Sequence, residues 1–348
     1  MQITRESIFI STIRSFCTGF AIFLGILLAI GLGFLTIGFF SGPDLLAPKA
    51  EITIVQDANG NREVLPLSSP AILRIDIHGT IGDTYLTSTD IDHILLDSRE
   101  DLLQHNRVKG ILLHIDTPGG TVTDGSAIHK LLLDYKAKYK VPIYAYVDGL
   151  CASGGMYVAS ACDKIFATPW SLVGSVGVIL PAHFNFSQAM DKWGIQAITL
   201  TEGKDKDTFN PYRPWGPNEA NSLQPVMAAL YDQFVDAVTT GRPRLDKQQL
   251  ITTYGAQVFI AQTAMEYGYI DSASATYSDA LKALVSAAGI SPEEHYQVVQ
   301  LSAPHNLFVD ILKARSTLFQ GKIIHRIQIH PSLPDELCGQ PLYLYLPQ

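Results

Sequence analysis

The sequence predicts an α/β domain with a mostly parallel sheet and flanking helices, preceded by one membrane-spanning helix. From Ala71 onward, short apolar runs typical of buried strands alternate with longer amphipathic runs typical of helices. Ahead of them, residues 15–43 carry no charged side chain. That run exceeds the roughly 20 apolar residues that cross a bilayer as a helix.

The composition argues against several classes of protein. The 348 residues carry a formal net charge of −8, and only 17% of them are charged, below the roughly 25% of soluble domains. An acidic chain without a basic cluster is not expected to bind nucleic acid. The four cysteines form no C-x-x-C pair, which argues against a disulfide framework and a zinc site. We expect neither a metal nor a cofactor.

The apolar run is expected to be an uncleaved anchor. A cleavable signal peptide is the alternative, but its apolar part is usually about 7–15 residues long. Arg5 and Arg14 precede the run and Asp44 follows it, so residues 1–14 are expected in the cytoplasm and the chain beyond residue 43 outside it. The protein is thus predicted to be single-pass.

The remaining elements are expected in a βα order. Residues 44–70 read as a linker with a possible hairpin, because "ITIV" and "EVLPL" flank the turn signal Asn59-Gly60. A long helix is expected from Pro217 to near Gly241, and Asp124 is expected to cap another. The other expected elements are strands at 71–77, 110–115, 141–147, 164–168 and 176–180, and helices at 90–105, at 124–139 and from near Ser153.

Two glycine-rich turns follow parallel-type strands. "IDTPGG" ends at Gly120, and "CASGG" places Ser153 before two glycines. Ligands of open α/β sheets bind at the carboxyl ends of strands. There the backbone N–H groups of Gly154 and of Gly119 or Gly120 could converge on one oxyanion, with Ser153 as the nucleophile. The alternative is that the two glycine turns have no catalytic role and only allow helices to pack closely.

A serine nucleophile needs a base. His183 is the nearest downstream histidine, and a Ser-His-Asp arrangement stays open, whereas His114 lies inside an apolar strand and reads as a core histidine. Lys204 and Lys206 alternate with two aspartates. In an extended segment, the lysines would share one face and the aspartates the other. A solvated run of charges is the alternative.

Three stretches in order carry a resemblance. "IDTPGG", "VDGLCASGGMYVASACDKIFATPWSLVGSVGVI" and "EGKDKDTFNP" resemble the signal peptide peptidase A (protease IV) family of membrane-bound Ser/Lys peptidases, in its short, single-repeat form. The resemblance runs from about Ala71 to Leu284. Cys151 and Met156 depart from the family pattern without touching an expected catalytic role.

The resemblance assigns roles residue by residue. Ser153 matches the nucleophile, and Lys206, with Gly203 three before it and Pro211 five after it, matches the general base; Lys204 fits that frame less well. Ser175 matches the serine that holds the lysine amine. Gly154 and the pair Gly119 and Gly120 match the oxyanion hole, and which glycine of the pair donates stays open.

The resemblance also implies a fold, an assembly and a substrate class. It implies a ClpP/crotonase-like core and a ring of identical subunits, in which the lysine of one protomer approaches the serine of its neighbour. The expected substrates are cleaved signal peptides and other hydrophobic peptides at a bacterial inner membrane. The peptidase domain is expected at 71–290 and a C-terminal extension at 291–348, whose "LYLYL" could add to a sheet edge or plug a groove.

Two other classes of function remain as alternatives. A crotonase-type enzyme acting on acyl-CoA would use the same pair of backbone donors without needing Ser153 or Lys206. A non-catalytic membrane scaffold would need neither residue. Reactivity of Ser153 separates the peptidase from both.

Overall fold

The computed structural model describes residues 8–40, 51–84, 86–302 and 342–344. The chain divides into two compact units, one made of residues 1–49 and 304–322 and the other of residues 50–303 and 323–348. In the first unit, helix α1 spans Ile8–Phe40. Its stretch Ser11–Gly33 is long and apolar enough to cross a membrane, a property that an anchor shares with a signal sequence. The end of the expected anchor, residues 41–43, lies outside the described residues.

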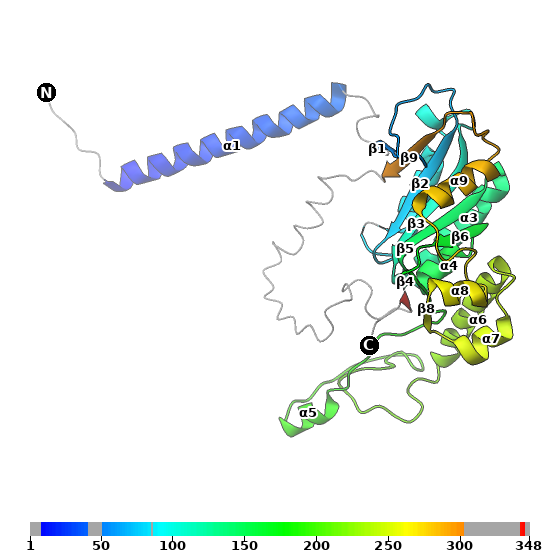
Figure 1. The fold of residues 1–348 in the computed structure, drawn as a ribbon. Coiled ribbons are helices and arrows are strands. Elements are labelled where there is room, and N and C mark those ends of the chain that lie inside the picture. Colours follow the sequence, from blue (N-terminus) through cyan, green and yellow to red (C-terminus); the bar gives the residue numbers. More distant parts are fainter. Residues whose placement is uncertain (1–7, 41–50, 85, 303–341, 345–348) are drawn as a thin grey trace. The chain divides into compact units, whose positions relative to one another are not determined.

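The second unit is built on a mostly parallel sheet, drawn from blue to orange in Figure 1. The described part of this sheet has eight strands, in the order β1-β9-β2-β3-β5-β7-β8 with β6 beside β5. The pairs among β2, β3, β5, β6, β7 and β9 are parallel, whereas β1 and β8 pair antiparallel at the two edges. The strands of this sheet are β1 Glu51–Val55, β2 Ala71–His78, β3 Val108–Thr117, β5 Ile143–Ala152, β6 Lys164–Ala167, β7 Leu172–Gly174, β8 Val258–Ile260 and β9 Gln297–Ser302.

A second, two-stranded sheet pairs β4 (Gly119–Thr121) with β10 (Leu342–Leu344). The helices of this unit include two very short turns of helix, η2 and η3. They are α2 Ser88–Asp97, η2 Asp101–Leu103, α3 Val122–Tyr139, α4 Gly154–Ala159, α5 Ser187–Lys192, α6 Gln224–Gly241, α7 Lys247–Gln249, η3 Leu250–Tyr254, α8 Ala261–Tyr267 and α9 Tyr277–Ala287.

Helices cover both faces of the main sheet. Successive strand residues point to opposite faces, and on β2 Ile72 packs toward α9 whereas Leu73 packs into the core shared with α2, α3, α4 and α6. Strands buried on both faces read as continuous apolar runs. This confirms the α/β fold class expected from the sequence.

Several local expectations were wrong. The 52–67 hairpin does not form, because β1 pairs with β9 and residues 62–66 are not a strand. Thr121, not Asp124, caps α3: its hydroxyl accepts from the Asp124 N–H and donates to the Asp124 carboxylate. Helix α6 begins at Gln224 rather than at Pro217, and β7 lies before the expected strand at 176–180.

Residues 181–223 form an arm between β7 and α6. The arm contains the short helix α5, which projects away from the sheet in Figure 1. Seven of its apolar or aromatic side chains are largely exposed: Phe184, Phe186, Trp193, Ile195, Ile198, Leu200 and Tyr212. An exposed apolar segment of this kind is typical of a contact surface.

Candidate active site

Ser153 lies at the sharp turn from β5 into α4. Its backbone has φ 53° and ψ −116°, a conformation that costs a non-glycine residue on the order of 1–3 kcal/mol. Two hydrogen bonds hold the turn: the Ser153 N–H donates to the Gly174 carbonyl at 2.9 Å, and the Tyr157 N–H donates to the Ser153 carbonyl at 3.0 Å. Strain that is held in place this way at a strand end is typical of a functional residue.

The Ser153 hydroxyl is buried and unpaired. The residue is 1% exposed, and its Oγ has no hydrogen-bond partner among the residues that the structure describes. Burying an unsatisfied hydroxyl costs on the order of 1–3 kcal/mol. A hydroxyl kept in this state is available to a group from outside this chain, such as a substrate or the base of another subunit.

The turn between β3 and β4 lies against the first turn of α4. A Cβ added at Gly155 would lie 2.5 Å from the Thr117 side chain, so only glycine allows this close packing. The Asp116 carboxylate accepts the Leu150 N–H at 2.9 Å and ties the ends of β3 and β5 together. Gly154 is the first residue of α4, and the N–H groups of the first turn of a helix have no partner within the helix.

The two glycines of β4 differ in their backbone partners. The Gly119 N–H donates to the Thr117 hydroxyl at 3.1 Å. Ile81 bonds the residues on either side of Gly120, donating to the Gly119 carbonyl at 2.8 Å and accepting from the Thr121 N–H at 2.9 Å. In such a parallel bridge, the N–H and C=O of Gly120 point to the opposite edge of the strand.

Gly120 also has no room for a side chain. A Cβ at this position would lie 1.8 Å from the Ile81 carbonyl oxygen. The close approach of the two backbones therefore depends on glycine. Of the two candidates, Gly120 has the N–H that faces away from Ile81 and is not taken by Thr117.

Ser175 lies beside the nucleophile turn. Ala152 pairs with Gly174, so the residues that follow them, Ser153 and Ser175, leave neighbouring strand ends together. Ser175 is 6% exposed with φ 55°, and its N–H donates to the Gln257 carbonyl at 2.7 Å. The structure thus brings Ser153, Ser175 and the oxyanion-hole candidates together at the carboxyl ends of neighbouring strands.

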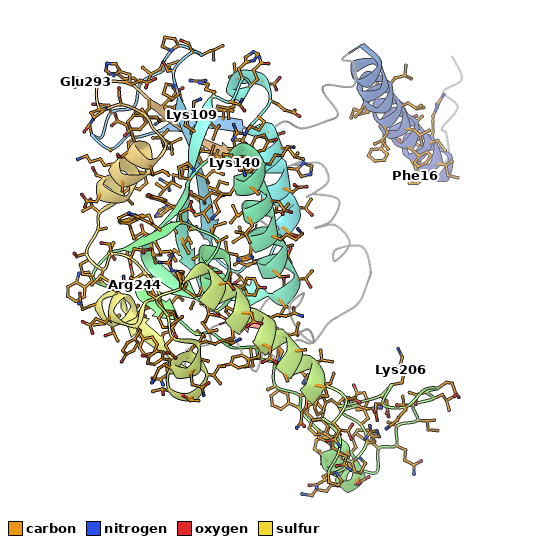
Figure 2. The ribbon with its side chains drawn as sticks, turned by 90° about the vertical axis from the view of Figure 1, so that its right-hand side faces the viewer. Phe16, Lys109, Lys140, Lys206, Arg244 and Glu293 are labelled. Carbon is orange, nitrogen blue, oxygen red and sulfur yellow. The ribbon has the colours of Figure 1, made fainter. Side chains whose placement is uncertain are left out.

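Lys206 is not part of this cluster within one chain. It is exposed and lies on the arm, where Figure 2 labels it away from the sheet. The expected extended run is wrong, because residues 204–209 form tight turns with positive φ at Asp205 and Phe209. The alternation of the two lysines with aspartates therefore does not define two faces.

The lysine turn is fixed by an arginine clamp. Arg213 donates to the Asp207 carboxylate at 2.7 Å and to the Glu219 carboxylate at 2.7 Å. The Arg213 guanidinium lowers the pKa of Asp207, and with two backbone N–H groups it lowers the pKa of Glu219 to about 2. Because Arg213 binds Asp207, the nearest downstream carboxylate to Lys206 already has a cationic partner.

The two histidines considered from the sequence lie elsewhere. His183 is exposed on the arm, with its ring 4.9 Å from that of Phe209. His114, on β3, has a polar partner at each ring nitrogen: its Nδ1 lies 2.7 Å from the Arg74 guanidinium and its Nε2 lies 2.8 Å from the Asp148 carboxylate. Neither belongs to the turn of Ser153.

One cluster has ligand types that metals use. The ligand atoms of Asp76, His78 and His114 lie within 4.8 Å of one another. Arg74, however, donates to Asp76 at 2.7 Å and its guanidinium lies 2.7 Å from His114 Nδ1. The Asp76 carboxylate and the His114 ring thus already have a cationic neighbour. The cluster is better suited to holding β2 and β3 together than to binding a cation.

Two residues that shape the site were assigned no role from the sequence. Thr117 engages the Gly119 N–H and packs against Gly155, while Asp116 fixes Leu150. Both stand inside the "IDTPGG" stretch next to the glycines. Polar residues at the carboxyl end of an apolar strand were the signal that could have identified them.

Comparisons with known proteins agree with this geometry. The family model described as peptidase family S49 matches residues 136–291, and the Clp protease model matches residues 74–173. "Putative signal peptide peptidase SppA" of Enterococcus faecium is 30% identical over 59% of this chain and 60% of that protein. "Putative protease slr0021" of Synechocystis is 32% identical over 55% of this chain and 68% of that protein.

A plant relative is more distant. "Serine protease SPPA, chloroplastic" of Arabidopsis thaliana is 27% identical over 63% of this chain and 32% of that protein. The chain thus spans about 60% of the length of the Enterococcus relative and about a third of the Arabidopsis one. From these matches and the ClpP-like sheet with its serine turn, the chain belongs to peptidase family S49, the signal peptide peptidase A family of serine peptidases.

Proposed function

We propose that the protein is a membrane-anchored serine endopeptidase that uses Ser153 as nucleophile and Lys206 as general base. The buried, unpaired Ser153 hydroxyl on its strained turn is the observation that carries this proposal. Family membership supports the class of reaction. The assignment of Lys206 rests on the resemblance of its flanking residues to the family motif.

The oxyanion hole is assigned to Gly154 and Gly120. Gly154 opens α4 directly after the nucleophile, and the Gly120 N–H faces away from Ile81. Backbone donors preset toward a developing oxyanion are a large catalytic contribution, and removal of one costs about 10²- to 10³-fold in kcat. Gly119 is left in a supporting role, because its N–H is bound to Thr117.

The general base is proposed to come from a neighbouring subunit. Lys206 is exposed on the arm, and the exposed apolar side chains of the arm provide a surface that a neighbour would cover. A lysine acts as a base only when its pKa falls from about 10.4 toward 7–8, a cost of about 4 kcal/mol that burial in a contact can supply. Ser175 would then accept a hydrogen bond from the lysine amine.

The reaction follows from these roles. Ser153 Oγ attacks the peptide carbonyl while its proton passes to the uncharged Lys206 amine. The oxyanion is stabilised by the Gly154 and Gly120 N–H groups, and Lys206 returns the proton to the departing amine. Water then attacks the acyl-enzyme, with Lys206 taking its proton and Ser153 recovering its own.

The proposed substrates are cleaved signal peptides and other hydrophobic peptides. The proposed organisation has a cytoplasmic N-terminus at 1–14, an anchor at 15–43, a linker at 44–70, a peptidase domain at 71–290 and an extension at 291–348. The peptidase domain would face away from the cytoplasm at a bacterial inner membrane, within a ring of identical subunits. The basic residues before the apolar helix support that orientation.

Four variants of the full chain in detergent micelles test the proposal. We expect Ser153→Ala to abolish cleavage of an apolar reporter peptide and labelling by a fluorophosphonate probe. Lys206→Ala should lower cleavage by about 10²- to 10⁴-fold, while His183→Ala and Lys204→Ala stay near wild type. Ser126→Ala on α3 is the matched serine control, because the Ser126 hydroxyl donates to the Thr123 carbonyl of its own helix.

Two results would contradict the proposal in different ways. Full activity of Lys206→Ala would show that Lys206 is not the general base, and His183 and Lys204 would then be the remaining candidates. Absence of probe labelling in the wild-type chain would favour an acyl-CoA enzyme or a non-catalytic scaffold.

A further inference from the structure

We infer that Asp116 and Asp148 are positioning residues of the active site, because they hold a bulge of β5 that places Ser153 beside the oxyanion-hole glycines. The inference rests on the proposed peptidase function and adds two residues to it. Neither carboxylate contacts the reacting atoms in this scheme. Both act through the backbone that leads to Ser153.

Strand β5 carries a bulge just before the nucleophile turn. Ile115 of β3 pairs with Val147 of β5. The next paired residues are Thr117 and Cys151, so three residues of β5, Asp148 to Leu150, lie opposite one residue of β3. A bulge next to an active site typically re-aims the side chains that follow it.

The bulge sets the level at which Ser153 leaves the sheet. With three residues opposite one, every later residue of β5 is set back along β3 by two positions, or about 6–7 Å. A misplacement of about 1 Å can already cost about 10²-fold in rate. Ser153 therefore reaches the oxyanion-hole glycines only while the bulge keeps its shape.

The other neighbour of β5 changes at the same place. Residues 144–147 of β5 pair with β6, whereas residues 150–152 pair with β7. The bulge thus also sets Ala152 opposite Gly174, the pairing that places Ser175 next to Ser153. A change in the bulge would move the nucleophile relative to both of these neighbours.

A carboxylate of β3 clamps one side of the bulge. Asp116, the residue opposite the bulge, accepts the Leu150 N–H at 2.9 Å. Gly149 leaves room for this contact, because a Cβ there would lie 2.3 Å from the Asp116 carboxylate. The bulge therefore depends on an acceptor at residue 116 and on a glycine at residue 149.

A histidine–aspartate pair clamps the other side. His114 Nε2 lies 2.8 Å from the Asp148 carboxylate. Arginine has only donors, so His114 Nδ1, 2.7 Å from the Arg74 guanidinium, is the acceptor, and Nε2–H donates to Asp148. Arg74 in turn donates to Asp76 at 2.7 Å on β2. The bulge is thus tied through β3 to β2.

Substitutions at the first clamp test the inference in the full chain in detergent. Asp116→Leu removes the acceptor but keeps the side-chain volume, so we expect kcat for an apolar reporter peptide to fall about 10- to 10²-fold at unchanged KM. Asp116→Asn keeps an oxygen for the Leu150 N–H and should stay near wild type. Gly149→Ala displaces the Asp116 carboxylate and should resemble Asp116→Leu.

The second clamp offers a matched pair of its own. Asp148→Leu should lower kcat in the same way, whereas Asp148→Asn still accepts from His114 Nε2–H and should stay near wild type. Asp92→Leu, at an exposed carboxylate of α2, is the control and should keep wild-type kcat and KM.

Labelling by a fluorophosphonate separates a misplaced serine from an unfolded chain. A misplaced Ser153 lowers the rate constant of labelling but not its final extent, whereas an unfolded fraction lowers the extent. We expect Asp116→Leu and Asp148→Leu to be labelled fully, about 10- to 10²-fold more slowly than wild type. Wild-type rate constants in both variants would overturn the inference and leave the peptidase intact.

Hydrogen exchange makes the test independent of catalysis. In the Ser153→Ala background, the Leu150 amide should exchange at least about tenfold faster in Asp116→Leu than in Asp116→Asn. Equal exchange in these two chains would overturn the inference, whether or not the protein cleaves peptides. The expected exchange together with a wild-type serine that no fluorophosphonate labels would overturn the peptidase, and with it the positioning role.

Discussion

At the scale of single residues, the site depends on two backbone positions that tolerate little change. Ser153 adopts a strained conformation and keeps a buried hydroxyl unpaired. Gly120 meets the Ile81 carbonyl so closely that no side chain fits. The strained backbone and the unpaired hydroxyl of Ser153 destabilise the fold locally, and a strained conformation of this kind persists only where the surrounding structure enforces it.

A substitution at Gly120 tests the assigned donor. Gly120→Ala would place a Cβ 1.8 Å from the Ile81 carbonyl oxygen, so β4 must shift and its N–H must leave the site. We expect kcat/KM for the reporter peptide to fall by at least about 10²-fold, the effect of losing one oxyanion donor.

Gly216→Ala is the matched control, because a Cβ there meets no atom within 4 Å. Retention of wild-type kcat/KM by Gly120→Ala would show that Gly120 is not a donor and would move the role to Gly119.

At the scale of elements, the packing of α3 against α4 gives the fold a pH dependence. His129 on α3 is half-buried against Tyr157 of α4, with ring centroids 5.1 Å apart. Burial, with a smaller effect of the Lys136 charge, lowers the pKa of His129 to about 4. The folded protein therefore keeps this histidine neutral at pH values where the unfolded chain binds a proton.

The sign of the pH effect follows from linkage. Above about pH 6.5, His129 is neutral in both the folded and the unfolded protein, so its titration does not change the free energy of unfolding. Between about pH 6.5 and 4, only the unfolded state gains the proton, so stability falls as the pH falls, by up to about 3 kcal/mol. His129→Gln should flatten this part of the pH profile.

Urea unfolding of the full chain in detergent, followed by fluorescence between pH 7 and pH 4, measures the effect. His93→Gln on α2 is the control, since His93 is exposed. An equal loss of stability on acidification in wild type and His129→Gln would refute the assignment.

The arm, residues 181–223, is the other element on which the proposed mechanism depends. The Arg213 clamp on Asp207 and Glu219 fixes the turn that carries Lys206, although the arm itself contacts solvent along many apolar side chains. A rigid turn on an exposed arm is suited to placing one amine into a neighbouring subunit. Preorganised positioning of a base is what proton transfer from Ser153 requires.

At the scale of the whole molecule, the sequence predicted what local patterns determine. Alternating apolar and amphipathic runs predicted the parallel sheet. The position of Ser153 after a strand and before two glycines predicted a turn into a helix, which the structure confirms. The positions of Ser175 and of the glycine pair beside this turn follow from strand order, which βα alternation only partly determines.

Other features depend on contacts between distant segments and could not be predicted. The partner of β1 is β9, more than 200 residues later in the chain, so a local turn signal at Asn59-Gly60 suggested a hairpin that does not form. The pairing of β10 with β4 also joins segments more than 200 residues apart. The turn at Asp205 depends on positive φ at non-glycine residues, which alternation of charges does not signal.

The central claim is that one active site is assembled from Ser153 of one subunit and Lys206 of another. Mixing two inactive full-length chains, Ser153→Ala and Lys206→Ala, under conditions that allow subunit exchange tests it most directly. Mixed assemblies contain sites with an intact Ser153 next to an intact Lys206, so we expect cleavage of the reporter peptide to reappear at about a quarter of the wild-type rate per subunit for a random equal mixture of adjacent pairs. Confirmed subunit exchange without any recovered cleavage would contradict the account.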